Sequence, residues 1–151
     1  MPRIRLKENF GAIVQVEIRL PPDLSQEKQV LGIHSELVAG EALIDTGADV
    51  TAFDLKAAER AGLVRSGTGR LSTVLGQHDS ETLLFLGEIE IASFGAFTVP
   101  NGRGFDLSHL SYVAIIGRDI LRHGVLVYNG KEGWASLSRN GGSKERAPAP
   151  P

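Results

Sequence analysis

Short runs in which apolar and polar residues alternate, each closed by glycine or proline, constrain the fold of this chain more than any other feature of its sequence. The clearest run places apolar residues at every second position, at Val14, Val16, Ile18 and Leu20. Such alternation is typical of a strand that buries one face. Two prolines follow at positions 21 and 22, and proline ends a strand because it cannot donate to the sheet ladder. The sequence therefore predicts a turn-rich β fold.

Composition supports a single folded domain of this kind. Glycine makes up 18 of the 151 residues, well above an average share of about 7%. The hydrophobic share of 42% and the charged share of 23% are ordinary for a globular protein, and the length fits one domain. We expect the domain to span residues 1–138. Residues 139–151, which end in Ala-Pro-Ala-Pro-Pro, are expected to form a disordered tail.

The rest of the chain divides into short predicted elements. Apolar runs predict further strands at about 30–38, 41–44, 84–91, 94–99, 113–116 and in a hairpin over 125–137. Helical spacing and terminal capping residues predict two short helices, at 54–62 and 118–123. Polar or glycine-rich stretches predict a surface connection at 23–29, a tight turn at 39–40, a projecting hairpin at 67–80 and an irregular loop at 101–111.

Several classes of function are disfavoured at this level. A net charge of −2 gives no electrostatic basis for general nucleic-acid binding. The absence of cysteine excludes disulfides, thiolate zinc sites and thiol nucleophiles. The apolar runs are too short to span a bilayer or to form a signal peptide, so we expect a cytoplasmic protein. Four histidines, at 34, 78, 109 and 123, lie too far apart for metal-ligand spacing, so no metal site is expected.

The strongest chemical signal is a carboxylate placed directly after an apolar strand. Asp45 follows Leu43 and Ile44 and precedes Thr46 and Gly47. The glycine lets the backbone turn sharply beside the acid. A structural explanation is also open, because a strand followed by an Asx turn gives the same pattern. The tripeptide alone is a weak signal, since short motifs recur by chance.

A second segment strengthens the first. Downstream, an apolar strand is again followed by glycine and then by a charged helix start, in the order Ala114-Ile115-Ile116-Gly117-Arg118-Asp119-Ile120-Leu121. The two segments, in this order and with a glycine-bearing hairpin between them, resemble the paired motifs of the retroviral-type aspartic proteases (the retropepsin family). The resemblance covers residues 30–121. It implies an all-β, retropepsin-like half-barrel with one or two short helices that is active as a symmetric homodimer, as in a bacterial or cellular member.

The resemblance also implies roles for individual residues. Asp45 matches the catalytic aspartate, and Thr46 matches a residue whose hydroxyl bonds across the dimer axis. Gly47 matches a glycine that lets substrate approach the carboxylate. Gly117 is expected to pack behind the loop that contains Asp45. Arg118 is expected to pair with the carboxylate at position 49 and to contact the partner subunit.

The implied substrate is an extended polypeptide that pairs with the enzyme as a strand does. The flap that covers it would be residues 72–80, with its tip near positions 75–78. The residues expected to line the cleft are Ala48, Asp49, Val74, Leu75, Gly76, Gln77, His78, Val113 and Ile115. Their side chains suggest apolar subsites.

Hydrolysis of a peptide bond by this chemistry needs two carboxyl groups, one acting as base and one as acid. The sequence contains one Asp-Thr-Gly motif, so the second carboxylate must come from a second copy of the chain. Neither motif requires a metal or an organic cofactor. A noncatalytic dimerisation or peptide-binding module on the same fold is the main alternative, and a small-molecule hydrolase is a weaker one. The intact motif favours catalysis, because a scaffold has no need of two mutually repelling acids.

Overall fold

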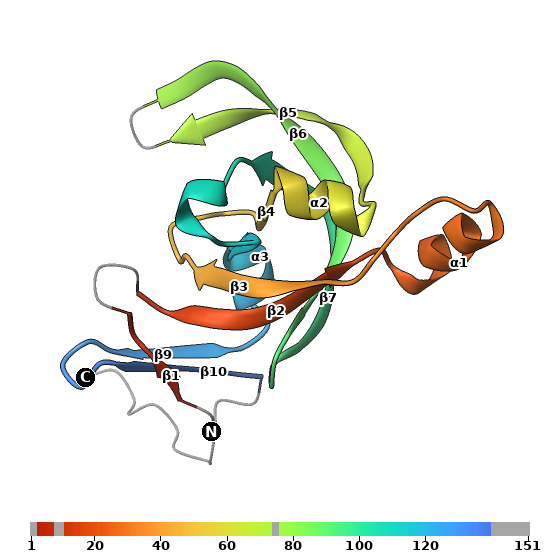
Figure 1. Ribbon diagram of the computed structural model, residues 1–151. Coiled ribbons are helices and arrows are strands. Elements are labelled where there is room, and N and C mark those ends of the chain that lie inside the picture. The colour runs from red at the N-terminus through yellow and green to blue at the C-terminus, as the bar shows by residue number, and fades with distance from the viewer. Residues whose placement is uncertain (1–2, 8–10, 74–75, 140–151) are drawn as a thin grey trace.

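The computed structural model describes residues 3–7, 11–73 and 76–139 (Figure 1). The strands are β1 (Ile4–Arg5), β2 (Ile13–Arg19), β3 (Val38–Ile44), β4 (Ala52–Asp54), β5 (Val64–Thr73), β6 (Gly76–Ile91), β7 (Gly95–Phe105), β8 (Ala114–Ile116), β9 (Val125–Asn129) and β10 (Trp134–Ser138). The helices are α1 (Pro22–Val30), α2 (Leu55–Ala61) and α3 (Arg118–Leu121), with a 3₁₀ turn, η1, at Ser108–Leu110. The prediction of a mostly β fold is confirmed.

Six of the strands close into a barrel. The larger sheet has the order β2-β3-β8-β4-β7-β6-β5, and β2 also pairs with β6, which joins the two ends of the six-stranded part. Strand β5 pairs with β6 outside this closed ring. A smaller sheet with the order β1-β10-β9 packs beside it (Figure 1). The barrel core contains the inward residues of β2 that the alternation predicts, and its fully buried members include Ile18, Phe53, Ile89 and Ile116.

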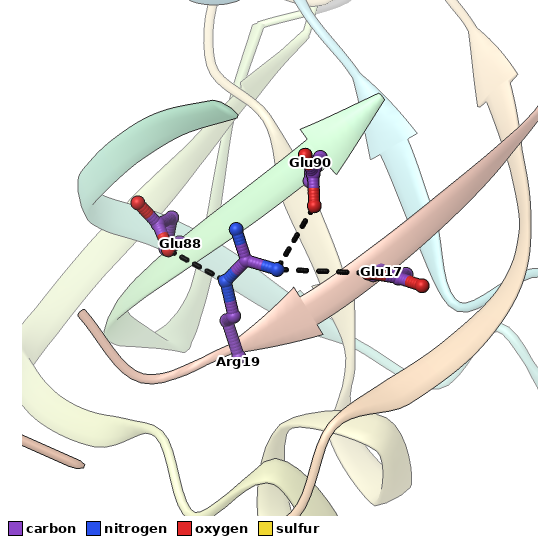
Figure 2. Close-up of polar contacts among 4 residues, drawn as sticks. All are labelled: Glu17, Arg19, Glu88 and Glu90. Carbon is purple, nitrogen blue, oxygen red and sulfur yellow. Dashed lines mark hydrogen bonds and ion pairs between the residues drawn. The ribbon is translucent and has the colours of Figure 1, made fainter. Parts of the chain in front are cut away.

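The barrel closes where β2 meets β6, and a cluster of four charged residues lies on this seam (Figure 2). Arg19 donates from Nε to Glu88 at 2.7 Å and from Nη1 to Glu90 at 2.9 Å, and Glu17 lies 3.5 Å from the same Nη1. The side chains of Arg19 and Glu88 are only 30% and 15% exposed. The hydrogen bond to Glu88 raises the pKa of Arg19 above its already high ordinary value. One guanidinium on β2 therefore contacts two carboxylates of β6 across the seam and a third on its own strand.

Helix α1 corrects two sequence predictions. Residues 23–29, predicted to be a surface connection, lie in a helix that starts with proline, carries Asp23 in its first turn and buries no residue. Proline at the start and an acid in the first turn favour a helix, but no apolar stripe marked it. The strand predicted at 30–38 is also wrong up to position 37. Its apolar residues Val30, Leu31, Ile33 and Leu37 are exposed, and regular strand begins only at Val38.

A predicted turn and the first part of a predicted loop are strand in the structure, and glycine serves packing at both places. No turn forms at positions 39–40, since β3 runs through them and a Cβ on Gly40 would lie 2.5 Å from Val113. Strand β7 extends to Phe105, so the first part of the loop predicted at 101–111 is strand. Gly102 and Gly104 in this part leave room for the rings of Phe53 and Phe85.

The other predicted elements are confirmed with small shifts. Asp54 caps α2 by accepting from the Ala57 amide, and Gly62 ends the helix in the left-handed region with φ of 68°. A helix follows Gly117, and the hairpin of β9 and β10 forms as predicted. The predicted tail lies outside the described residues except for Arg139, which donates to the Phe94 carbonyl. No helix in the described ranges is both long and apolar enough to cross a bilayer.

Candidate active site

The two sequence motifs meet at one edge of the barrel. Strand β8 pairs in parallel with β3, with Leu43 opposite Ile115 and Ile44 opposite Ile116. Strand β8 also pairs with β4 on its other side, so it lies between β3 and β4, two strands that follow each other in the chain. Because parallel strands end at the same edge, the segment after Ile44 and the segment after Ile116 leave the barrel side by side.

Asp45 is the first residue beyond β3. Its amide donates to the Ile116 carbonyl at 2.9 Å, which continues the pairing of β3 and β8 by one step. Its carboxylate Oδ1 accepts from the Gly47 amide at 2.9 Å, and its carbonyl accepts from Ala48 at 3.2 Å. The Asx turn that the sequence left open is therefore present. Asp45 itself is half-buried, while Thr46 and Gly47 are exposed, so the turn orients the carboxylate and leaves it accessible to solvent.

Gly117 packs directly behind this turn. A Cβ at position 117 would lie 2.7 Å from the carbonyl carbon of Val50 and 3.0 Å from the Ala48 oxygen. Real Cβ atoms do not approach backbone so closely, so a larger residue would push the loop away from α3. The φ of Gly117, −96°, is accessible to any residue. Glycine is therefore required here by the close approach of the loop and not by the backbone conformation.

Arg118 fastens the loop from its other side. Its amide donates to the Ala48 carbonyl at 2.8 Å, and its Nη1 donates to the Thr46 carbonyl at 2.8 Å. The expected ion pair with Asp49 is not among the ion pairs of the described residues, and this expectation is corrected. The guanidinium is directed at a backbone carbonyl instead, and the Asp49 carbonyl accepts from the Asp119 amide at 3.2 Å.

Thr51 and Asp119 complete the connection, and neither was predicted from the motifs as a site residue. Thr51 is fully buried. Its hydroxyl donates to Asp119 Oδ1 at 2.8 Å and accepts from the Gly117 amide at 3.1 Å. Asp119 Oδ1 also accepts from the amides of Thr51 and Ile120, each at 3.0 Å. The sequence signal that could have identified Thr51 is a polar residue set between apolar neighbours, Val50 before it and Ala52-Phe53 after it.

Four of the residues expected to line the cleft lie on two segments: Ala48 and Asp49 on the Asp45 loop, and Val113 and Ile115 just before and within β8. Ala48 is half-buried on the loop, and Asp49 is exposed. Val113 and Ile115 are half-buried and share one face, since Ala114 and Ile116 between and after them point into the core. Both lie beside the segment that leads into Asp45.

The predicted projecting hairpin is formed by β5 and β6. Thr73 pairs with Gly76, and the backbone of Gly76, Gln77 and His78 belongs to β6. Val74 and Leu75 lie outside the described residues. In Figure 1 the hairpin curves away from the barrel above α2, and its end lies on the side of the view where β3 ends.

An open depression of about 320 Å³ lies next to the loop. Its lining includes Ile44 and Thr46 from the Asp45 region and Leu126 and Tyr128 from β9. Tyr128 is 61% exposed, and Val125 and Val127 of the same strand are also exposed. An apolar surface thus begins immediately beside Thr46.

In the parts of the chain that the structure describes, no group of three or more histidine, aspartate or glutamate side chains is arranged to hold a metal ion. No protein-family model matches the sequence, and no curated protein matches it either.

Proposed function

We propose that this chain is a retropepsin-like aspartic endopeptidase that works as a homodimer, with one Asp45 contributed by each subunit. The observation that carries the proposal is the setting of Asp45. It stands at the end of β3, half-exposed, with one carboxylate oxygen held by the Gly47 amide and its loop hydrogen-bonded to residues 116–119. A general acid or base needs an oriented carboxyl group that solvent and substrate can reach.

The chemistry follows from two such carboxyl groups sharing one proton. The ionised Asp45 takes a proton from a water molecule while the water oxygen attacks the carbonyl carbon of the peptide bond. The protonated Asp45 of the second subunit gives its proton to the carbonyl oxygen. Transfer of a proton to the amide nitrogen then allows the carbon–nitrogen bond to break, which releases an amine and a carboxylic acid.

Three of the other described aspartates, Asp54, Asp106 and Asp119, are each held by a structural partner, so we do not assign the second carboxylate to them. Asp54 is buried and accepts from the amides of Ala57 and Leu107. Asp119 is bound to Thr51. Asp106 accepts from the Ser108 hydroxyl and amide, which lower the pKa of its carboxyl group. Asp119 lies in the segment next to the Asp45 loop, but three donors of the fold already occupy its Oδ1. We therefore assign the partner carboxylate to the Asp45 of a second subunit.

The exposed surface around β9 is where we place the second subunit. In the described residues β9 is the last strand of the order β1-β10-β9. It exposes Val125, Val127 and Tyr128, and the depression beside it reaches Thr46. Exposed apolar side chains next to an edge strand favour association with another chain. A contact there would lie next to the loop that must approach its symmetry mate.

The substrate that fits the proposal is an extended polypeptide. The β5–β6 hairpin can close over such a chain by strand-like pairing. Val113 and Ile115 offer half-buried apolar side chains beside the segment that carries Asp45. We therefore expect a preference for apolar residues near the cleaved bond.

Cleavage profiling tests the proposal. The wild-type protein, Asp45→Asn and a matched control, Asp23→Asn on the exposed helix α1, are each incubated with a library of unfolded peptides at mildly acidic and neutral pH. New peptide ends are identified by mass spectrometry. We expect the wild type and the control to cleave and Asp45→Asn to lose at least ~100-fold in rate, with the melting temperature preserved. Cleavage by Asp45→Asn at the wild-type rate would refute the assignment. Peptide binding without cleavage by the wild type would favour the noncatalytic module.

A further inference from the structure

We propose that Thr51 and Asp119 are positioning residues that fix the Asp45 loop against the start of α3. The effect on turnover rests on the proposed function, whereas the effect on the loop does not. Neither residue contacts the Asp45 carboxylate. They act on the far end of the segment whose near end is Asp45.

The segment 45–51 is bound along its whole length to four consecutive residues. The Ile116 carbonyl accepts from the Asp45 amide, and the Arg118 and Asp119 amides donate to the carbonyls of Ala48 and Asp49. The Gly117 amide donates instead to the Thr51 hydroxyl. The near end is secured by the β3–β8 ladder. At the far end, the Thr51 and Asp119 side chains take the place of ladder bonds.

The Thr51 hydroxyl is suited to this place because it donates and accepts at once. It donates to Asp119 Oδ1 at 2.8 Å and accepts from Gly117 at 3.1 Å. Thr51 is 0% exposed, so water cannot replace these bonds without the loop opening. Valine, which has the same shape, would leave the Gly117 amide and the Asp119 oxygen without this partner, and an unpaired buried polar group is unfavourable.

Asp119 acts as a hydrogen-bond acceptor rather than as a charge. Three donors, the Thr51 amide, the Thr51 hydroxyl and the Ile120 amide, all point to the same oxygen, Oδ1. An asparagine side chain presents a carbonyl oxygen at that position and can accept the same three bonds. If the negative charge were what mattered, asparagine would fail. If the acceptor matters, asparagine suffices and alanine fails.

A loop displaced by loss of these hydrogen bonds would lower turnover, because the reacting groups must be held closely in place. A misplacement of about 1 Å can cost about 100-fold in rate. The loop between Asp45 and Thr51 carries the amide of Gly47 that orients the carboxylate. Loosening the far end therefore lowers the fraction of molecules in which the carboxylate points correctly, and kcat falls while substrate binding is retained.

The test compares Thr51→Val and Asp119→Ala with the conservative variants Thr51→Ser and Asp119→Asn. Thr98→Val, an exposed threonine on β7 outside both segments, is the matched control. Two quantities are measured on the full chain: hydrogen exchange of the amides of residues 45–49, and kcat and KM for fluorescently labelled casein. Exchange of the β2 and β6 amides serves as the reference for global stability.

We expect Thr51→Val and Asp119→Ala to speed exchange at residues 45–49 at least ~10-fold relative to β2 and β6. We expect them to lower kcat at least ~10-fold with KM within about 2-fold. Thr51→Ser and Asp119→Asn should stay within about 3-fold of wild type in both. Unchanged exchange in Thr51→Val would overturn the proposal, as would an Asp119→Asn variant as impaired as Asp119→Ala. Casein left intact by wild type would count against the proposed function and leave the exchange result decisive for the loop.

Discussion

At the scale of single residues, the described aspartates differ in how fully their carboxylates are engaged. Asp54 and Asp119 each accept from two or more donors of the fold. Asp45 is held by the one amide of Gly47 and is half-exposed. A carboxylate that is oriented but accepts few hydrogen bonds from the fold is available for chemistry. This contrast separates Asp45 from Asp54 and Asp119, and the Asp-Thr-Gly motif separates it from the exposed aspartates.

Arg118 offers a prediction that separates a local role from a role in association. In one chain its exposed guanidinium uses Nη1 on the Thr46 carbonyl, and the planar fork carries further N–H donors for a contact with a second subunit. We expect Arg118→Lys to change the free energy of unfolding by less than ~1 kcal/mol, as for other exposed contacts. The dimer dissociation constant should rise, because an ammonium cannot form a bidentate contact with a second subunit. Sedimentation over a concentration series measures this.

Arg122→Lys, an exposed arginine at the end of α3, is the control for Arg118→Lys and should leave association unchanged. If Arg118→Lys also leaves both the dissociation constant and the cleavage rate unchanged, Arg118 only supports the Thr46 carbonyl.

Residue identities were predictable where a motif constrains the backbone. Asp45, Gly47 and Gly117 occupy positions at which a strand end, a tight turn or a close approach admits few alternatives. The direction of a long side chain has no such constraint, which is why the expected Arg118 pair with Asp49 was wrong. Thr51 was missed because a lone buried hydroxyl in an apolar run forms no motif, although its two hydrogen bonds join both segments.

At the scale of elements, local signals predicted helix α2 and missed helix α1. Helix α2 has an aspartate cap, a buried alanine face and a terminal glycine in the left-handed region. Helix α1 has no buried face, so the periodicity on which sequence analysis depends is absent. Most strands with a buried face were predicted, but β4 was missed although all three of its residues are buried. They were cut short where glycine makes room for an aromatic ring.

The Arg19 cluster gives a prediction about the seam between β2 and β6. Replacing Arg19 with methionine keeps much of the side-chain bulk but leaves Glu17, Glu88 and Glu90 facing one another without a cation (Figure 2). We expect the free energy of unfolding to fall by about 1–2 kcal/mol, because hydrogen bonds to charged groups are lost from a partly buried place. Thermal unfolding at low and high salt measures the loss, which should shrink at high salt as repulsion is screened.

Arg60→Met is the matched control for the Arg19 cluster. Arg60 pairs with Glu36 at 2.8 Å on an exposed surface, with 64% of its side chain accessible. Loss of such a pair changes stability by less than ~1 kcal/mol. Equal losses in the two variants would show that the seam gains nothing from its partly buried guanidinium.

The β5–β6 hairpin gives a prediction about substrate binding. It extends beyond the closed ring of strands (Figure 1), so its backbone amides depend mainly on pairing within the hairpin. We expect hydrogen exchange at residues 73–80 to slow at least ~10-fold when a non-cleavable extended peptide binds. Exchange in α1, which lies at the right of Figure 1, opposite the end of the hairpin, should not change. Unaltered exchange at 73–80 with saturating peptide would mean that another segment covers the substrate.

At the scale of the whole molecule, closure of the barrel brings the site together. The pairing of β2 with both β3 and β6 fixes β3 within the ring, and β8 then lies between β3 and β4. This arrangement depends on the register of strands far apart in the chain, and register follows from which faces become buried together. Sequence patterns predicted most of the strands and the two motifs, but neither β1 nor β4. The closed ring and the parallel β3–β8 pair could be found only from the three-dimensional structure.

The proposed homodimer gives the prediction that belongs to this scale. If each site needs an Asp45 from both subunits, a mixed dimer of wild type and Asp45→Asn has one carboxylate and no working site. Wild-type and variant chains carrying different affinity tags are co-expressed, and the mixed dimer is isolated through both tags. Its cleavage rate should be at least ~100-fold below that of the wild-type dimer.

A mixed dimer of wild type and Asp23→Asn, prepared identically, should retain full activity. Half the wild-type rate in the Asp45→Asn mixed dimer would show that each subunit works alone. Specific activity that stays constant on dilution to monomer would show the same, because a shared site is lost when the subunits separate.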